Sequence, residues 1–459
     1  MAEPAPGDGP FPSGEAVQDF LACARETLTA NDVGDFVKPG RHQYPHQWNW
    51  DAALVAMGLA HFDEARARKE VRSLLRGQWL DGMIPHVVYH NGSSDYFPGP
   101  DFWHIEQSVA APPRVRTSGL VQPPLLATCV RRMHRRAGDR EASLAFVREV
   151  YPQLLRWHRW LHRARDPEGT GLVAIVHPWE SGTDNAARFV QPLMQVTPTQ
   201  MPDYQRRDSA HVSADERPQH ADYERFVYLI DRFRHWGYDP ETMYQRSPFL
   251  VQDTLFNAVT YQAHEDLIAL AEEIGEPTAE LERWRYRLRR AFNGKLWDDE
   301  EGLYFAYDAR HHQLVRENGV ATFAALYAGL ADRAQAEVLV GAHLENAEEY
   351  APDGHSRFLV PSQAKNNYFF EPRRYWRGPV WILINWMVMQ GLERYGYADL
   401  AERVRRDSLT LMRSAGFYEY YDPRDGSPAG ASDFSWSAAL ALEMVEPMPL
   451  PAAGGASGG

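Results

Sequence analysis

Two short segments of the sequence place carboxylates among aromatic residues. The first, HPWESGTDN at 177–185, carries Trp179, Glu180 and Asp184 around a Ser-Gly-Thr turn. Cleavage of a glycosidic bond requires a protonated carboxyl beside the leaving oxygen, with its pKa raised by partial desolvation. An aspartate in a turn lined by Trp and Gly suits that role, although Asp and Ser also favour turns for structural reasons alone. The segment therefore predicts Asp184 as a general acid, with turn chemistry as the alternative.

The second segment, AGFYEYYDP at 415–423, sets Glu419 between tyrosines in a stretch too aromatic for a solvated surface. A carboxylate on the other side of a bound sugar would activate a water molecule by taking its proton. Glu419 is therefore predicted to be the general base that completes the pair.

A third segment, YPHQWNWDAAL at 44–54, gathers Tyr44, Trp48 and Asp51 at the start of an expected helix. Trp48 and Asp51 are three residues apart and share a helix face. Apolar sugar faces stack on rings while hydroxyl edges take planar polar groups, so the cluster predicts a sugar pocket. The alternative is an aromatic staple with Asp51 at the positive end of the helix.

Further pocket candidates are weaker when each is taken alone. The turn at Gly82 and Pro85 holds His86 and Tyr89 at a pocket rim, or else forms a tight aromatic loop. Gln122 precedes a proline pair at an expected helix start. The remaining candidates come from YWRGPVWILINW at 375–386 and DFSWSAAL at 433–440: Tyr375, Trp376, Arg377, Trp381, Asn385 and Trp436, with Ser435 or Asp433 as the expected helix cap.

Composition excludes several classes of protein. The formal net charge of −14 argues against nucleic acid and anionic membranes as partners. No run approaches the ~18 apolar residues of a membrane helix, and the first residues lack a secretion signal. Two cysteines make no disulfide framework, which favours the cytoplasm. The expected partner is a small glycoside, and the oligomeric state stays open. The histidines lack the spacing of a zinc-binding helix, so no metal or cofactor is predicted.

Helical periodicity dominates the chain and predicts an all-α fold. The expected helices are 64–80, 120–137, 142–164, 253–275, 278–297 and 377–396, with shorter ones at 321–331, 333–343, 398–414 and 434–444. Gly275, Gly294 and Gly396 stand at expected C-caps. Strand patterns are few, at 86–90 and 302–308. Helices paired through long polar and aromatic loops indicate concentric rings of α-hairpins.

Three segments fall outside that helical pattern. Residues 185–250 are polar and rich in Arg, Asp and Pro, and are too long for an ordinary connection. They predict a lid over the pocket, with a partly disordered surface loop as the alternative. Residues 1–14 and 446–459 are predicted to be flexible tails, which leaves 15–445 as a single catalytic domain.

Taken together, YPHQWNWDAA, GMIPH, WESGTDN, YWRGPVW, GFYEYY and FSWSAA resemble glycoside hydrolase family 63, and within it the bacterial mannosylglycerate and glucosylglycerate hydrolases. The resemblance covers about 35–445, with the motifs in the family's order. It implies an (α/α)6 six-hairpin barrel and hydrolysis with inversion at the anomeric carbon.

The resemblance also implies roles for individual residues. Asp184 matches the general acid and Glu419 the general base. In the glycerate-specific relatives an Arg and a Tyr from the lid hold the glycerate carboxylate, and Arg217 and Tyr223 stand at the matching spacing; the alternative pairs Arg217 with lid carboxylates at the surface. Sugar-pocket positions match Tyr44, Trp48, Asp51, Gln122, Trp179, Gly182, Tyr375, Trp376 and Trp381.

One position departs from the family's pattern. Those relatives place a Gln just before the Ser-Trp of the last helix, where this chain has Asp433-Phe434. A carboxylate at 433 would repel an anionic aglycone unless it points away. The expected activity is therefore hydrolysis of 2-O-α-glucosyl- or 2-O-α-mannosyl-D-glycerate. The alternatives are an exo-α-glucosidase acting on a short oligosaccharide and a carbohydrate-binding protein without turnover.

Overall fold

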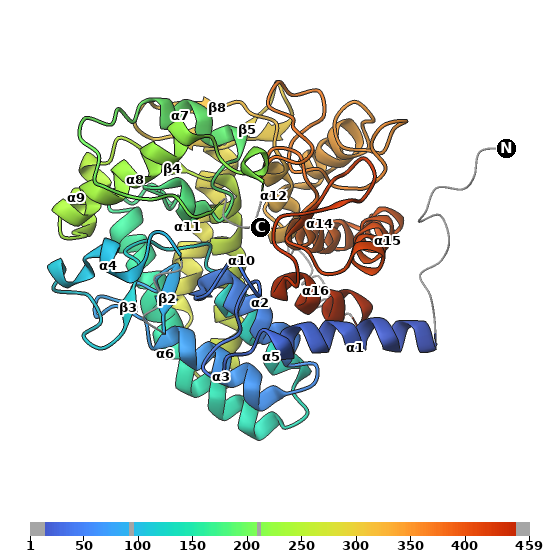
Figure 1. The fold of residues 1–459 in the computed structure, drawn as a ribbon, viewed down its shortest axis with the longest axis horizontal. Coiled ribbons are helices and arrows are strands. Elements are labelled where there is room, and N and C mark those ends of the chain that lie inside the picture. Colours follow the sequence, from blue (N-terminus) through green and yellow to red (C-terminus); the bar gives the residue numbers. More distant parts are fainter. Residues whose placement is uncertain (1–13, 91–95, 209–212, 447–459) are drawn as a thin grey trace.

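The structure is a computed structural model that describes residues 14–90, 96–208 and 213–446 (Figure 1). The predicted tails lie almost entirely outside the described residues, which begin at Gly14 and end at Glu446. Within the described chain, no helix is long and apolar enough to cross a membrane.

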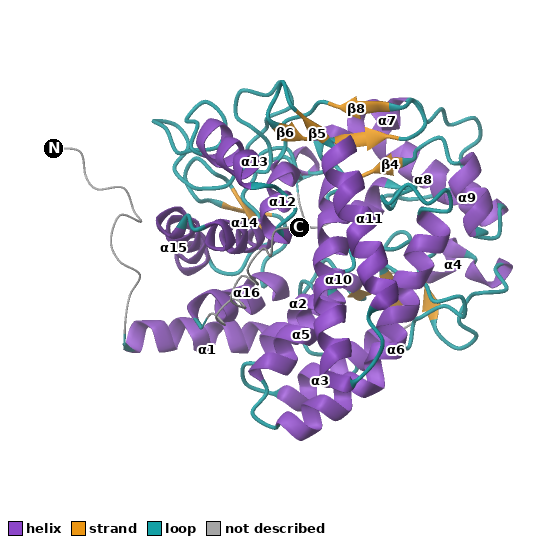
Figure 2. Cartoon of the chain, turned by 180° about the vertical axis from the view of Figure 1, so that it is seen from behind, coloured by secondary structure: helices purple, strands orange, loops and turns teal. Residues whose placement is uncertain are grey.

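Helices form most of the described chain, as the periodicity predicts (Figure 2). The α-helices are α1 (Glu15–Ala30), α2 (Asn49–Leu59), α3 (Glu64–Leu75), α4 (Pro100–Trp103), α5 (Leu126–Arg136), α6 (Arg140–Arg165), α7 (Val190–Met194), α8 (His220–His235), α9 (Pro240–Arg246), α10 (Thr254–Ile274), α11 (Ala279–Lys295), α12 (Ala324–Ala328), α13 (Arg333–Val338), α14 (Ile382–Tyr395), α15 (Ala398–Ala415) and α16 (Ser435–Val445).

The central helices contact one another in a closed cycle. Helix α2 packs on α5, α5 on α10, α10 on α12, α12 on α14, α14 on α16, and α16 again on α2. A second set lies outside them: α3 packs on α2, α6 on α5, α11 on α10, α15 on α14 and α1 on α16. The first and last helices of the chain are thus neighbours, as Figure 1 shows at the lower centre.

Sequence pattern separates the two sets of helices. Helix α2 reads NWDAALVAMGL, and every one of its residues is buried. Helix α3 reads EARARKEVRSLL and buries Ala67, Val71 and Leu74, which recur every three or four positions. Glu70 is buried as well, while the other charged side chains of α3 are exposed or half-buried. A helix that is apolar all round belongs inside, whereas an amphipathic one covers a core on one face only.

Strands are short and lie in the connections between helices. They are β1 (Gln47–Trp48), β2 (Val87–Tyr89), β3 (Arg116–Thr117), β4 (Val251–Gln252), β5 (Trp297–Asp298), β6 (Leu303–Tyr304), β7 (Ala306–Asp308), β8 (Gln313–Val315), β9 (Tyr420–Tyr421) and β10 (Pro428–Ala429). They pair antiparallel, in the orders β1-β2-β3, β4-β7-β8, β5-β6 and β10-β9. Trp48 faces Val87 across the first sheet, which fixes the loop in front of α2.

Several predicted bounds are wrong for identifiable reasons. The helix expected at 377–396 begins only at Ile382, because Pro379 lies in an extended stretch in which Val380 pairs with Tyr421. Gly275 and Gly396 end their helices in the left-handed conformation as expected, but Gly294 lies inside α11 and caps nothing.

The segment 185–250 also differs from the predicted loop. It contains α7, α8 and α9, and α8 alone runs for 16 residues. Its buried face carries Phe226, Ile230 and Phe233 at helical spacing, a pattern that its many Arg and Asp residues obscure in the sequence.

Candidate active site

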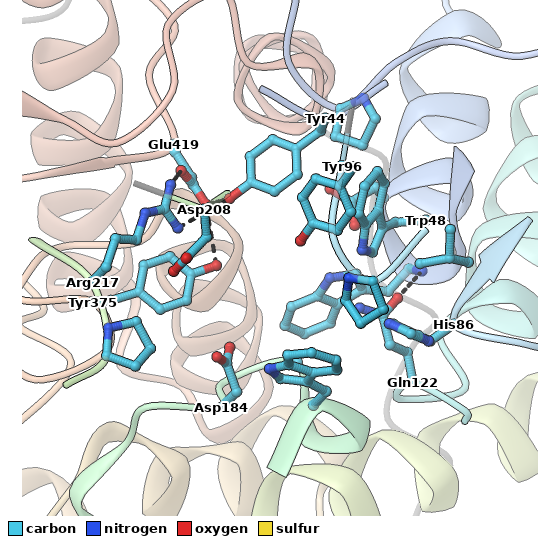
Figure 3. Close-up of a pocket in the computed structure, with 18 of the residues that line it drawn as sticks. Tyr44, Trp48, His86, Tyr96, Gln122, Asp184, Asp208, Arg217, Tyr375 and Glu419 are labelled. Carbon is cyan, nitrogen blue, oxygen red and sulfur yellow. Dashed lines mark hydrogen bonds and ion pairs between the residues drawn. The ribbon is translucent and has the colours of Figure 1, made fainter. Parts of the chain in front are cut away.

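The largest group of predicted site residues meets in one pocket at the N-terminal ends of the central helices. Asp51 lies in the first turn of α2, and Trp436 is the second residue of α16. Figure 3 shows Asp184 and Glu419 on different sides of this pocket. The predicted residues that line it are Tyr44, Trp48, Asp51, Tyr89, Gln122, Trp179, Gly182, Asp184, Arg217, Tyr223, Tyr375, Glu419 and Trp436.

A tight turn presents Asp184 to the pocket. The 3-10 turn η2 (Pro178–Ser181) ends at Gly182, whose φ of 70° is left-handed. A Cβ at Gly182 would lie 2.5 Å from the Trp50 ring, so this position requires glycine for both its conformation and its space. Downstream, the Asn185 side chain donates to the Tyr375 carbonyl oxygen at 2.8 Å and ties the turn to the opposite wall.

The pKa of Asp184 is raised to about 7, mainly by burial, with smaller contributions from the nearby charges of Asp208 and Glu419 and against the lowering effect of Arg217. The carboxyl is partly exposed, because it opens onto the pocket. A carboxyl with this pKa keeps a substantial protonated fraction near neutrality, and the protonated form is the one that a general acid needs.

Glu180, the other carboxylate of the same motif, has a structural role. It is buried and pairs with Arg165 at 2.8 Å. Its oxygens also accept from the backbone N–H groups of Val176 at 2.8 Å and Val121 at 3.3 Å. Glu180 therefore holds the turn in place, and Asp184 is the carboxyl that faces the pocket.

Glu419 is held by four donors. Its Oε1 accepts from the hydroxyls of Tyr44 at 2.8 Å and Tyr375 at 3.2 Å. Its Oε2 accepts from the Ala431 backbone N–H at 3.1 Å and from Arg217 Nη2 at 3.3 Å. The carboxylate is buried, with 1% of its surface exposed. Every one of these contacts requires an acceptor oxygen, so the site is built for the ionised form.

Arg217 is buried in the pocket, unlike the surface arginine of the alternative prediction. Its Nη1 donates to the Tyr44 hydroxyl at 3.1 Å, and its guanidinium lies 4.7 Å from the centre of the Tyr375 ring. Its Nε has no partner among the described residues. Tyr223 lines the pocket elsewhere and donates to the Phe97 carbonyl oxygen at 3.4 Å.

Asp51 is a third carboxyl in the pocket. It is 5% exposed, and burial together with the charge of Glu419 raises its pKa to about 8. Tyr44 and Trp48 meet edge to face in the same wall, with ring centres 5.2 Å apart. Gln122 accepts from the Trp50 backbone N–H at 3.3 Å and fixes the start of α2. The wall thus offers aromatic faces and polar edges, which suits a sugar.

Sequence analysis missed several lining residues. The most important of them is Asp208, because its charge lies close enough to affect Asp184. Arg206 donates to its carboxylate at 2.6 and 2.8 Å, and Gln43 donates to its carbonyl oxygen at 3.1 Å. No aromatic motif surrounds it in the sequence. The other lining residues that had not been selected are Pro39, Trp50, Val87, Tyr96, Pro98, Trp103, Pro218 and Phe434, whereas His86, expected at the pocket rim beside Tyr89, does line the pocket.

Four predicted pocket residues do not line the cavity: Trp376, Arg377, Trp381 and Asn385. The Arg377 Nε donates to the Asn185 carbonyl oxygen at 2.9 Å, and the Asn385 amide donates to the Leu359 carbonyl oxygen at 2.7 Å. Trp376 and Trp381 stack on each other with ring centres 3.6 Å apart and lie buried behind Tyr375 and Trp436. They support the wall and do not present a stacking face to a ligand.

The structure also resolves the question raised by Asp433. Its side chain is exposed and lies outside the pocket. The residue takes a left-handed φ of 50°, and its carbonyl oxygen accepts from Asn31 at 2.6 Å. The predicted cap is wrong, because Phe434 takes the N-cap position of α16 without a side-chain bond, and Ser435 donates instead to the Lys38 carbonyl oxygen.

A helical ring with an acid and a carboxylate across an aromatic pocket is the arrangement of a glycoside hydrolase, and comparisons with known proteins agree. Residues 44–437 match the family model described as the mannosylglycerate hydrolase MGH1-like glycoside hydrolase domain. The chain belongs to this family, which confirms the resemblance to glycoside hydrolase family 63.

Two proteins of similar sequence show how far the likeness extends. The mannosylglycerate hydrolase of Thermus thermophilus is 45% identical over 420 residues, which cover 91% of this chain and 99% of the relative. The glucosylglycerate hydrolase of Mycolicibacterium hassiacum is 34% identical over an alignment that covers 93% of this chain and 97% of the relative. A crystal structure of a mannosylglycerate hydrolase from Thermus thermophilus, in complex with Tris and D-glycerate, superimposes with a TM-score of 0.87 at 44% identity, covering 92% of this chain and 99% of the other.

Proposed function

We propose that the protein hydrolyses 2-O-α-mannosyl- or 2-O-α-glucosyl-D-glycerate to the free sugar and D-glycerate, with inversion at the anomeric carbon. The observation that carries the proposal is the contrast between two carboxyl groups of one pocket. Asp184 has a pKa of about 7, while Glu419 is surrounded by four donors. Relatives named for both substrates support the choice of aglycone.

In the proposed reaction, Asp184 gives its proton to the glycosidic oxygen as the bond to the anomeric carbon breaks. Glu419 takes a proton from a water molecule, and the resulting hydroxide attacks that carbon from the other face. An α-glycoside therefore yields a β-sugar first. Inversion requires the two carboxyl groups to lie roughly 6.5–9.5 Å apart.

The other pocket residues divide between the two parts of the substrate. Asp51, Trp48 and Gln122 belong to the sugar end, where buried polar groups and ring faces meet hydroxyls. Arg217 and Tyr223 belong to the glycerate end, where the Arg fork matches a carboxylate. The exposed position of Asp433 supports an anionic aglycone, because this carboxylate does not face the pocket.

The fold-level part of the proposal extends the observed ring. We assign the inner and outer helices to an (α/α)6 toroid, with 15–445 as one catalytic domain, 185–250 as an inserted lid and the cytoplasm as its location. The closed cycle of contacts and the few cysteines support these assignments.

An exo-α-glucosidase acting on a short oligosaccharide remains the second candidate, because Phe434 lines the pocket where the glycerate-specific relatives have a Gln. A panel of glucosylglycerate, mannosylglycerate and α-linked disaccharides tests both. Turnover of a glycosylglycerate is expected, and turnover of disaccharides alone would replace the proposed substrate with the second candidate.

Asp184→Asn and Glu419→Gln should each lower kcat by about 10²–10⁴-fold on that substrate, with the melting temperature preserved. Proton NMR of the first product should show the β-anomer. Appearance of the α-anomer first would rule out inversion.

A further inference from the structure

The hydrogen bonds of Glu419 leave no room for the water that it must activate. An ionised carboxylate has about four acceptor positions on its two oxygens. Here Tyr44 and Tyr375 occupy Oε1, while Arg217 and the Ala431 N–H occupy Oε2. A water can lose its proton to Glu419 only if it first donates a hydrogen bond to one of these oxygens. One of the four donors must therefore leave.

The contacts indicate which donor leaves. The Ala431 N–H is fixed, because the Glu419 N–H donates back to the Ala431 carbonyl oxygen at 2.9 Å. The Tyr375 backbone is held by Asn185 and by the Glu216 carbonyl oxygen. Arg217 makes the longest of the four contacts, 3.3 Å, on a long side chain whose Nε is buried without a partner among the described residues.

Arg217 is also the only charged donor of the four. A second carboxylate in the pocket competes with Glu419 for the charged guanidinium, because a charge-assisted hydrogen bond is strong. It attracts a neutral hydroxyl or backbone N–H much more weakly. Removal of the guanidinium therefore opens an acceptor position on Oε2 for a water molecule.

We propose that Arg217 caps Glu419 in the ligand-free protein, and that the carboxylate of the aglycone draws the guanidinium away and frees Oε2 for the attacking water. This inference rests on the proposed function and deepens it. The proton passes from water to Glu419 Oε2, and Arg217 only changes its partner. Arg217 is thus a positioning residue that makes the charge of the substrate a condition for fast hydrolysis.

The test compares two substrates that differ only in charge: a 2-O-α-glycosylglycerate and the matching glycosylglycerol, in which a hydroxymethyl group replaces the carboxylate. With the wild type, kcat on the charged substrate should exceed kcat on the neutral one by about tenfold to a hundredfold. Arg217→Gln and Arg217→Ala should lose efficiency on the charged substrate but raise kcat on the neutral one. Arg246→Ala, an exposed lid arginine on α9, is the matched control and should change neither rate.

The neutral substrate separates the cap from the other roles of an active-site arginine. A residue that merely orients Glu419 would lower kcat on both substrates when removed, and this result would overturn the proposal. A residue that merely binds the carboxylate would leave kcat on the neutral substrate unchanged, which would also overturn it. If the wild type hydrolyses only neutral α-glycosides, the proposed substrate fails, but Arg217→Gln must still raise kcat on them for the cap to stand.

A structure provides a readout that does not depend on turnover. Asp184→Asn, which lacks the acid, should bind intact glycosylglycerate with Arg217 paired to its carboxylate and a water within hydrogen-bond reach of Glu419 Oε2. Arg217 remaining 3.3 Å from Glu419 in that complex, or no binding at all, would overturn the proposal.

Discussion

Asp208, in the segment 185–250, contributes to the pKa of the proposed general acid, Asp184. Its charge is one of the groups that raise the pKa of Asp184, next to the larger effect of burial. Asp208→Asn removes a negative charge while keeping the shape, so the pKa of Asp184 should fall below about 7. A general acid works only while protonated, and its rate is lost as pH rises through its pKa. The basic limb of kcat/KM against pH should therefore move to lower pH.

Asp203→Asn is the matched control for this shift. Asp203 is an exposed carboxylate of the same segment that does not line the candidate pocket, so its loss should leave the limb in place. The pKa of Asp51 is raised by burial and by Glu419 rather than by Asp208, so it does not follow the substitution. A limb unmoved in Asp208→Asn would mean that Asp184 does not set it.

At this scale, the sequence predicted residues in aromatic motifs and missed those that lie outside them. Asp184 and Glu419 were found because carboxylates among Tyr, Trp and Gly are rare on a solvated surface. Asp208 comes from a polar stretch, and contacts with Gln43, 165 residues away, place it in the pocket. Trp376 was placed wrongly because a motif does not say which way a ring points, and here a left-handed φ of 58° belongs to a buried stack.

At the scale of secondary-structure elements, the 3-10 turn Ala214–Glu216, just before Arg217, is bound to two neighbouring loops. The Glu216 carboxylate pairs with Arg373 at 2.6 Å and accepts from the Gly430 N–H at 3.2 Å. Its carbonyl oxygen accepts from the Tyr375 N–H at 3.1 Å. These contacts join the segment 185–250 to the loops that carry Tyr375 and Glu419, and so fix the position of the Arg217 backbone.

Glu216→Ala should therefore lower kcat/KM by about 10- to 100-fold, because displacements of about 1 Å in an active site cost rates of that size. The melting temperature should change little, since the pair with Arg373 is partly exposed and such pairs contribute little stability. Glu224→Ala on α8 is the control, because among the described residues Glu224 forms an ion pair only with exposed His220. Equal kinetics for the two variants would show that the fastening does not position the site.

Hydrophobic periodicity predicted some helices correctly and failed in the segment 185–250. Existence and type were predictable for α6, α10 and α15, where apolar residues recur over many turns. Helix α8 was predicted as loop, because Arg and Asp fill most of its positions and only the spacing of Phe226, Ile230 and Phe233 indicates its buried face. The start of α14 was misplaced because Pro379 and Val380 belong to a strand-like contact with Tyr421, which lies in a distant part of the chain.

For the whole molecule, the pocket exists only once the ring closes. Its residues run from Pro39 near one end of the chain to Trp436 near the other, and α16 completes the cycle by packing on α2 and α14. Local helix patterns predict the parts of such a fold, but nothing in one helix specifies its partner at the far end of the chain. The closure depends on close approaches, where small residues let two helices meet.

The closest of these approaches lies where α2 meets α16. A Cβ added at Gly58 would stand 2.4 Å from the Cβ and 2.6 Å from the Cα of Ala439, so backbone would have to move. Gly58→Ala should therefore destabilise the protein by about 1–3 kcal/mol or more through overpacking. Gly294, exposed on the outer helix α11 with nothing within 4 Å, is the matched control. Gly294→Ala should stabilise by about 0.5–1 kcal/mol through helix propensity. Calorimetry should show one variant melting below the wild type and the other slightly above it, while equal destabilisation of both would mean that α2 and α16 do not close the ring at this point.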